Sequence, residues 1–181
     1  YLTRDMVALS PDVVAVVDSV ESKNIIFLDA NTGKVVNKLL HSAEVTEISL
    51  NQAICSGGDL RILAFTDRNR DLYVANLSSS SSGATVPTYK LQPHVESFRF
   101  NDATNVLVGL ADGRMMTWLE PSVAFTDRDL VNLSTLSSED AASRFGRNAI
   151  ITAFTGSRAT VRKVDGSVVF FAVAPDVSLL Y

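Results

Sequence analysis

Two carboxylates and the single tryptophan are the residues of this chain whose types could support catalysis. Asp112 and Asp165 each stand directly before a glycine, and Trp118 follows the first pair closely in the sequence. Two convergent carboxylates beside an aromatic platform could supply the general acid and base of a glycosidase. Aspartate before glycine is, however, first of all a turn signal. We therefore predict structural roles for Asp112-Gly113, Asp165-Gly166 and Trp118, expect no enzyme, and keep a glycosidase-type site as the lesser alternative.

Metal and thiol chemistry find little support in the sequence. His41 and His94 each lie near a glutamate, but their spacing supplies no third ligand for a metal ion. We interpret both histidines as structural groups that bond to backbone or to an aspartate. The single cysteine, Cys55, excludes an internal disulfide and a cysteine-based zinc cluster, and is typical of a reducing compartment. We expect no metal and no cofactor.

Short apolar runs flank both Asp-Gly turns and predict β-hairpins. Residues 106–111 and 114–119 flank the first turn, and residues 159–164 and 167–174 flank the second. Asp-Gly between such runs is the strongest short-range hairpin signal, because a type I′ turn needs positive φ at both central residues.

The hairpins recur at a regular interval along the chain. Weaker examples span residues 13–30 and 62–77, so that the turns fall near residues 22, 69, 112 and 165. This spacing of roughly 43 to 53 residues is close to the ~40–45 residues of one WD-type propeller blade. We predict an all-β chain of about four WD40-type β-propeller blades, forming an incomplete propeller whose other blades lie outside the chain. The predicted blades are residues 1–42, 43–93, 94–127 and 149–181.

One segment departs from the blade pattern, and residues 128–148 form a predicted linker with a short helix. Residues 137–146 contain a capping serine, Glu139 and Asp140 for the positive end of the helix dipole, and a closing glycine. Irregular segments on a rigid scaffold often carry binding function. We predict a protein-interaction surface of Glu139, Asp140 and Arg144, with a plain connection between blades as an equally weighted alternative. Outer strands are predicted at residues 122–126 and 177–181.

Charge and hydropathy argue against two classes of partner. The net charge is −4 with no basic block, which argues against nucleic-acid binding. The apolar runs stay far below the ~18 residues of a membrane helix, so we expect no direct membrane insertion. No signal-peptide pattern is evident. The serine-rich tract 78–83 is predicted to be a solvated loop.

The order of motifs in the second half of the chain resembles one family of WD-repeat proteins. From Asn105 to Tyr181 the chain contains LVGLADGRMMTWLEP, VAFTDRDL and SSEDAASRFGRNAIITAFTGSRATVRKVDGSVVFFAVAPDVSLLY. These segments resemble the C-terminal part of the second propeller of the intraflagellar transport protein 80 family, most specifically at residues 127–130, 145–147 and 161–166. The earlier segment LSPDVVAVVDSVESKNIIFLDANTGK fits the preceding blades of that propeller.

The resemblance implies two tandem propellers followed by a helical-repeat tail. It implies a non-enzymatic scaffold subunit of intraflagellar transport complex B that supports the assembly and maintenance of cilia. The implied partners are other complex B subunits and a second copy of the protein, and the implied locations are the cilium or flagellum, the basal body and the cytoplasm. A vesicle-coat WD-repeat scaffold shares this plan and is the alternative; a catalytic propeller is less favoured. The resemblance carries over no ligand-binding residues.

Overall fold

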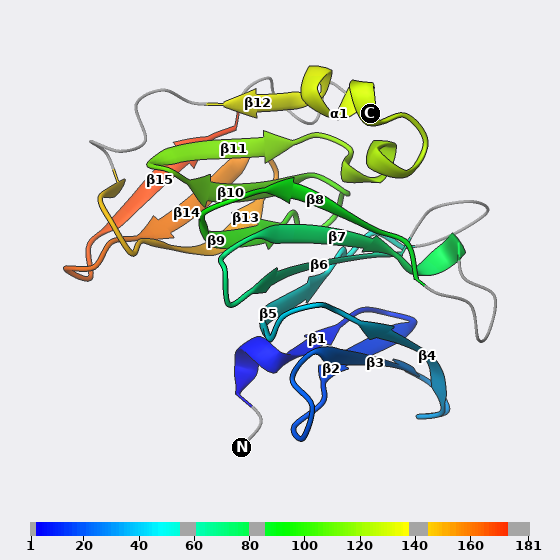
Figure 1. Ribbon diagram of the computed structural model, residues 1–181. Coiled ribbons are helices and arrows are strands. Elements are labelled where there is room, and N and C mark those ends of the chain that lie inside the picture. The colour runs from blue at the N-terminus through cyan, green and yellow to red at the C-terminus, as the bar shows by residue number, and fades with distance from the viewer. Residues whose placement is uncertain (1–2, 55–60, 80–85, 138–144, 174–181) are drawn as a thin grey trace. The chain divides into compact units, whose positions relative to one another are not determined.

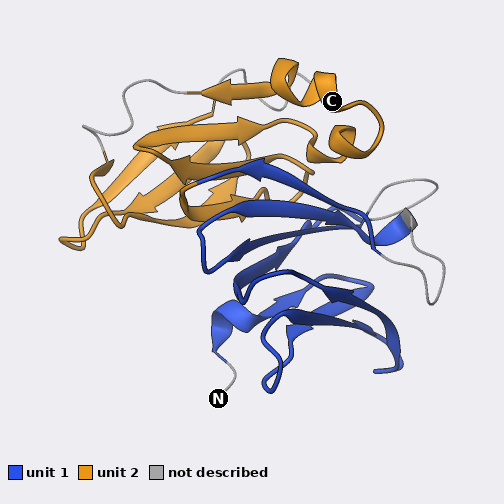
Figure 2. Ribbon diagram, in the orientation of Figure 1, with its two compact units in different colours: residues 1–93 blue, residues 94–181 orange. Residues whose placement is uncertain are grey.

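Antiparallel β-sheet dominates the computed structural model, which describes residues 3–54, 61–79, 86–137 and 145–173 (Figure 1). Four sheets follow one another along the chain, and within each sheet the neighbouring strands are consecutive in the sequence. The chain divides into two compact units, residues 1–93 and 94–181, and each unit holds two sheets (Figure 2). This succession of antiparallel meanders is the blade architecture that the turn spacing predicts.

Two four-stranded sheets make up the first unit, and β-branched residues, which favour extended strands, are frequent in them. The first sheet consists of β1 (Val7–Leu9), β2 (Val13–Val17), β3 (Asn24–Asp29) and β4 (Val35–Leu40), preceded by the 3₁₀ turn η1 (Arg4–Met6). The second consists of β5 (Val45–Leu50), β6 (Ile62–Asp67), β7 (Leu72–Asn76) and β8 (Thr88–Gln92), with η2 (Leu77–Ser79) after β7. Both hairpins predicted in this unit are present, since β2 and β3 pair within residues 13–30 and β6 and β7 pair within residues 62–77.

One apolar cluster joins the two sheets of the first unit. Alternate residues of each strand face it, because successive side chains point to opposite sides of a sheet. The buried members include Ala15, Val17, Ile25 and Phe27 from the first sheet and Ile48, Leu63 and Phe65 from the second. Burying a large aliphatic or aromatic side chain contributes roughly 1.5–3 kcal/mol, so this shared cluster holds the two sheets together.

The second unit pairs a four-stranded with a three-stranded sheet in its described part. The first sheet consists of β9 (Val95–Phe100), β10 (Leu107–Ala111), β11 (Arg114–Trp118) and β12 (Thr135–Ser137). The second consists of β13 (Ile150–Thr155), β14 (Arg158–Arg162) and β15 (Val168–Ala172). Their shared core includes Val106, Val108, Leu110, Ile151, Phe154, Ala159 and Val161.

The outer strand of the third sheet is not where the sequence predicts it. Of residues 122–126, expected as a strand, the first four lie in the 3₁₀ helix η3 (Pro121–Phe125) and Thr126 is its C-cap, because Pro121 fixes a helical φ at its start. The helix α1 (Arg128–Leu133) follows, with the Asp127 side chain accepting the Asp129 N–H as a cap. The outer strand of this sheet is β12, from the predicted linker, which pairs with β11 so that Trp118 lies opposite Thr135.

Two further predictions fall mainly outside the described residues. The predicted helix of residues 137–146 includes 138–144, which are not described, and Ser137, its expected cap, is the last residue of β12. The predicted last strand, residues 177–181, also lies outside the described residues. Within the described ranges, no helix combines the length and the hydrophobicity that crossing a bilayer requires.

Candidate functional site

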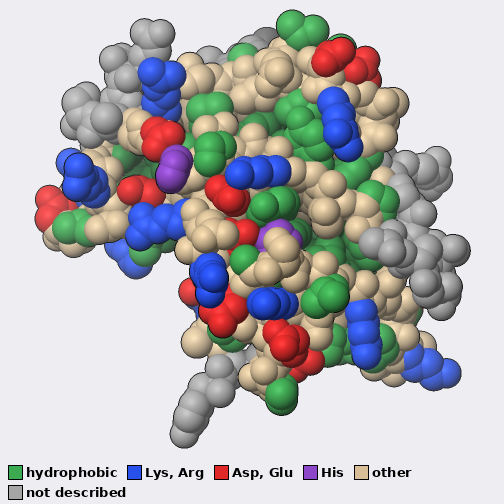
Figure 3. Space-filling view, viewed as in Figure 1, with side chains coloured by type: hydrophobic (Ala, Val, Ile, Leu, Met, Phe, Trp, Pro, Cys, Tyr) green, Lys and Arg blue, Asp and Glu red, His purple; other side chains and the backbone are tan. Residues whose placement is uncertain are grey.

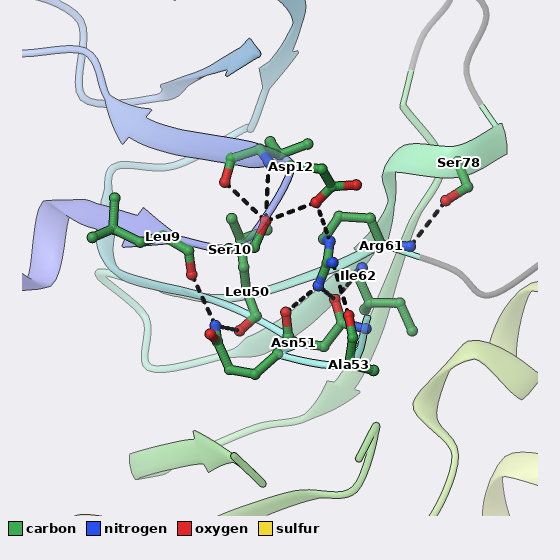
Figure 4. Close-up of polar contacts among 11 residues, drawn as sticks. Leu9, Ser10, Asp12, Leu50, Asn51, Ala53, Arg61, Ile62 and Ser78 are labelled. Atoms are coloured by element: carbon green, nitrogen blue, oxygen red, sulfur yellow. Dashed lines mark hydrogen bonds and ion pairs between the residues drawn. The ribbon is translucent and has the colours of Figure 1, made fainter. Parts of the chain in front are cut away.

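A buried arginine fastens the two sheets of the first unit to each other (Figure 4). Arg61 is 3% exposed, and its Nε donates a hydrogen bond to Asp12 Oδ1 at 2.8 Å. Its Nη1 donates to Asn51 Oδ1 at 3.0 Å and to the Asn51 carbonyl, and its Nη2 donates to the Ala53 carbonyl at 2.8 Å. These acceptors compensate a guanidinium that is otherwise costly to bury. We call Asp12, Asn51, Ala53 and Arg61 the Arg61 network.

Sequence reasoning missed the Arg61 network. Arg61 was not among the predicted site residues, and in the structure it directly precedes β6. The local signal was a charged residue at the start of the apolar run ILAF, where a side chain cannot reach water easily. The partner Asp12 lies 49 positions away in the sequence, so no local pattern could reveal the pair.

The second polar group of the first unit is a histidine–aspartate pair. The buried His41 Nε2 lies 2.8 Å from Asp67 Oδ2, and Asp67 Oδ1 accepts the N–H of Asn69 at 3.0 Å. The His41 ring contacts Phe65 and Tyr73 edge-on, with ring centroids 5.0 and 4.5 Å away. The structural role predicted for His41, a bond to an aspartate, is confirmed.

Charge near this pair also affects its neighbours. Burial, and then the negative charges of Asp67 and Asp71, raise the pKa of Tyr73 above its usual value. The Lys90 ammonium lies 3.0 Å from Asp71, and mainly this hydrogen bond raises the pKa of Lys90. His94 differs from His41: it is exposed with φ 55°, and its ring has no hydrogen bond within the described part of the chain.

The Asp112-Gly113 turn has the geometry predicted for it. Its two residues have φ values of 49° and 75°, both positive, as a type I′ hairpin requires. The turn joins β10 to β11, with Ala111 opposite Arg114.

Trp118 lies at the other end of the same hairpin and is buried, 2% exposed. A Cβ at Gly109 would come within 3.0 Å of Trp118 Cζ3 and 3.3 Å of Cη2. The absence of a side chain at Gly109 therefore makes room for the indole. The predicted core role of Trp118 is confirmed.

The Asp165-Gly166 hairpin is present, but its turn differs from the predicted type I′. Only Gly166 has a positive φ, 88°, and its N–H donates to the Lys163 carbonyl at 2.9 Å. The N–H of Lys163 donates to the Ser167 carbonyl at 2.8 Å, so the loop has three residues and ends in a left-handed glycine. Asp165 Oδ1 accepts the Ser167 hydroxyl at 2.6 Å and N–H at 2.9 Å, and these bonds lower the pKa of Asp165.

The three residues of the catalytic alternative are not brought together. Asp112 and Asp165 each occupy a hairpin turn, whereas Trp118 is buried at the far end of β11 from Asp112. Four strand positions separate Arg114 from Trp118, which is roughly 13 Å. Among the described residues, no group of three or more histidine, cysteine, aspartate and glutamate side chains could hold a metal ion.

The predicted interaction surface of Glu139, Asp140 and Arg144 lies outside the described residues and stays a prediction. Next to it in the sequence, α1 exposes two apolar side chains, Leu130 and Leu133. On the face seen in Figure 3, basic and acidic side chains are interspersed, without a large patch of one charge.

One face of the β13–β15 sheet stands out as a candidate binding surface. Along β14, Ala159 and Val161 are buried in the core, while Arg158, Thr160 and Arg162 point to the opposite side. Phe170 and Val168 of β15 lie opposite Thr160 and Arg162 and share this second face. We call Arg158, Thr160, Arg162, Val168 and Phe170 the β14–β15 face.

The β14–β15 face is open and hollowed. Phe170 is 54% exposed, and the Arg158 guanidinium carbon lies 5.1 Å from the centre of its ring, within cation–π range. A hollow of about 410 Å³ is lined by Ala153, Thr155, Ser157, Arg158, Thr160 and Phe170. This combination of cations, a hydroxyl and an exposed ring suits recognition of another protein better than covalent chemistry.

Comparison with known proteins decides the family. Residues 1–176 match the family model described as IFT80 second beta-propeller. The chain belongs to this family. Two curated relatives, each named intraflagellar transport protein 80 homolog, are 35% identical in Rattus norvegicus and 34% identical in Mus musculus. Each alignment covers 99% of this chain but 23% of the relative, so the chain spans about a quarter of their length.

The fold of the IFT80 second beta-propeller family is supported independently by a solved structure. The crystal structure of Kluyvelomyces marxianus Hsv2 matches with a TM-score of 0.55 and 11% sequence identity, covering 90% of this chain and 45% of that one. At this identity the similarity concerns the fold alone. The predicted all-β, WD40-type propeller class and the predicted resemblance to intraflagellar transport protein 80 are both confirmed.

Proposed function

We propose that the chain is part of a non-enzymatic scaffold subunit of intraflagellar transport complex B, acting through protein–protein contacts in the assembly and maintenance of cilia. The observation that carries this proposal is the match of residues 1–176 to the IFT80 second beta-propeller model. The named relatives of rat and mouse support it. Rigid sheets with loops at their ends are well suited to positioning several partners at once.

The architecture supports a scaffold in preference to an enzyme. The candidate catalytic residues occupy separate turns or the core, and the polar groups with the best geometry, the Arg61 network and the His41–Asp67 pair, bond within the fold. Among the described residues, the β14–β15 face and the exposed leucines of α1 are surfaces proposed for partners, and Glu139, Asp140 and Arg144 stay a surface predicted from the sequence alone. Other complex B subunits and a second copy of the protein are the proposed partners.

The test is co-purification of the full protein containing this chain from ciliated cells, followed by cross-link mapping. Complex B subunits should be recovered with cross-links to this chain, and a tagged protein should be found in the cilium or flagellum, at the basal body and in the cytoplasm. Reversing the charges of Glu139, Asp140 and Arg144 together should reduce recovery without lowering the melting temperature. Unchanged recovery would remove these residues from the interface, and absence of complex B subunits would contradict the proposed function.

A further inference from the structure

The second strands of the sheets show a regularity that β14 breaks. In the first unit, alternate residues of β2 face the next sheet of the chain: Val13, Ala15 and Val17. In the second unit, Val106, just before β10, and Val108 and Leu110 on it face the next sheet in the same way. These registers correspond, because Val13 and Val106 each accept a backbone hydrogen bond from the end of the first strand, from Ser10 and Asn101.

In β14 the corresponding positions carry cations. Arg158 pairs with Thr155 at the end of β13, so Arg158, Thr160 and Arg162 occupy the places that aliphatic residues hold in β2 and β10. Burying two arginines against another apolar sheet would desolvate both charges without compensation. The β14–β15 face therefore differs from the apolar faces of β2 and β10, and an occupant has to supply acceptors for two guanidinium groups, for which carboxylates are the strongest.

Within the described ranges, no carboxylate lies within salt-bridge distance of Arg158 or Arg162. Asp165 accepts two hydrogen bonds from Ser167, and Asp102 Oδ2 accepts the Thr155 hydroxyl at 3.0 Å. Arg158 and Arg162 are both exposed, and four strand positions separate them by roughly 13 Å. Between them lie Thr160 and Phe170, beside the hollow of about 410 Å³.

We propose that the β14–β15 face binds an extended acidic segment of a partner protein, with two carboxylates four residues apart and an apolar side chain midway. An extended segment repeats its side chains at the same rise as β14, so both carboxylates can reach the two guanidinium groups at once. Arginine forms strong, often bidentate, hydrogen bonds to carboxylates. The apolar side chain would cover Phe170 and enter the hollow. This inference deepens the proposed function and rests on it, since it specifies the chemistry of one partner segment.

The experiment titrates the full protein that contains this chain with a fluorescent synthetic peptide that has two glutamates four residues apart and a leucine midway between them. Anisotropy should report saturable binding. Arg158→Glu and Arg162→Glu should each weaken it by about tenfold or more, the scale of one lost charge-assisted hydrogen bond. Arg162→Lys should retain part of the affinity. Arg114→Glu, an exposed arginine on another sheet, is the matched control and should leave binding unchanged. Circular dichroism checks that each variant is folded.

Several results would overturn the inference. The inference would fall if Arg158→Glu and Arg162→Glu bound the peptide as tightly as the unmodified protein does. It would also fall if a peptide with glutamines in place of the glutamates bound as tightly as the glutamate peptide, or if no saturable binding were seen. Self-association that Arg162→Glu abolishes, seen by sedimentation without peptide binding, would replace the acidic segment with a second copy. If the peptide fails to bind while complex B subunits still co-purify, the inference falls and the proposed function stands. If arginine-dependent binding persists without co-purification, the proposed function falls instead.

Discussion

The two units solve the same structural problem with different chemistry. In both, an asparagine directly follows the first strand of a sheet, is almost fully buried, and donates its backbone N–H across to the second strand: Asn51 to Ile62 at 3.0 Å and Asn101 to Val106 at 2.8 Å. In the second unit the Asn101 side chain accepts the N–H groups of Ala103 and Thr104 and donates to the Gly156 carbonyl of the next sheet. Only neutral groups are used there.

In the first unit a charged side chain, Arg61, supplies part of this contact between sheets. The connection between β5 and β6 is longer than the one after Asn101, and Asn51 Oδ1 accepts from the Ile62 N–H and from Arg61. Arg61 then reaches the neighbouring sheet at Asp12. The cost is a buried cation that depends on every one of its acceptors.

This comparison predicts that mutation of the polar contact between sheets destabilises the first unit more than the second. Arg61→Ala should lower the free energy of unfolding of the first unit by about 3–5 kcal/mol, because the buried acceptors of Arg61 lose their donor. Denaturant unfolding, with hydrogen exchange read separately on peptides from β5–β6 and β9–β10, measures the loss and its location. Arg68→Ala, an exposed arginine of the same unit, should have little effect. A near-neutral Arg61→Ala would mean that the network contributes little.

In the second unit, shortening the neutral Asn101 side chain to alanine should destabilise the fold less than Arg61→Ala does in the first. Asn101→Ala should cost about 1–3 kcal/mol, the usual penalty for leaving buried backbone groups without a partner. The same unfolding experiment should locate the lost protection at β9–β10 and β13, with Asn132→Ala on the exposed side of α1 as control. A loss as large as that of Arg61→Ala would show that charge does not distinguish the two contacts between sheets.

Within the Arg61 network, Asp12 should contribute less to the free energy of unfolding than Arg61 does. Asp12 is half exposed, so Asp12→Asn, which keeps an acceptor oxygen, should cost no more than about 1 kcal/mol. Thermal unfolding at low and high salt measures the difference, which should shrink as salt screens the pair. A loss equal to that of Arg61→Ala would instead make the ion pair, not the carbonyl acceptors, the dominant contribution.

The smallest predicted effect is a pH dependence that both units share. Hydrogen bonds lower the pKa of Asp29, from the N–H groups of Thr32 and Asn31, and of Asp165, from Ser167. A lowered folded-state pKa adds stability above the unfolded value of about 3.9, and this stability is lost as the pH falls through the folded pKa. The stability gap between the native chain and Asp165→Asn should therefore narrow below about pH 4 in thermal unfolding. A gap independent of pH would contradict the ionised role of Asp165.

Much of the local structure could be predicted because short-range rules govern it. Short apolar runs between turn signals located the strands, and Asp112-Gly113 specified its turn because few residues accept positive φ. The same dipeptide at 165–166 was assigned the wrong turn type, since an added residue in the loop changes which position needs positive φ. The strand predicted at 122–126 was wrong because Pro121 and the Asp127 cap favoured helical turns over an apolar run.

The sequence by itself therefore determined the strands, their order and the family, since these depend on the local pattern of side chains and on motifs in fixed order. Only the tertiary structure decided that Arg61 is buried against Asp12, and that Arg158 and Arg162 lie on the side of their sheet that faces away from the core. Both outcomes depend on which face of one strand meets which neighbour. That is a matter of register and of contacts between distant residues, and alternation within a single strand cannot specify it.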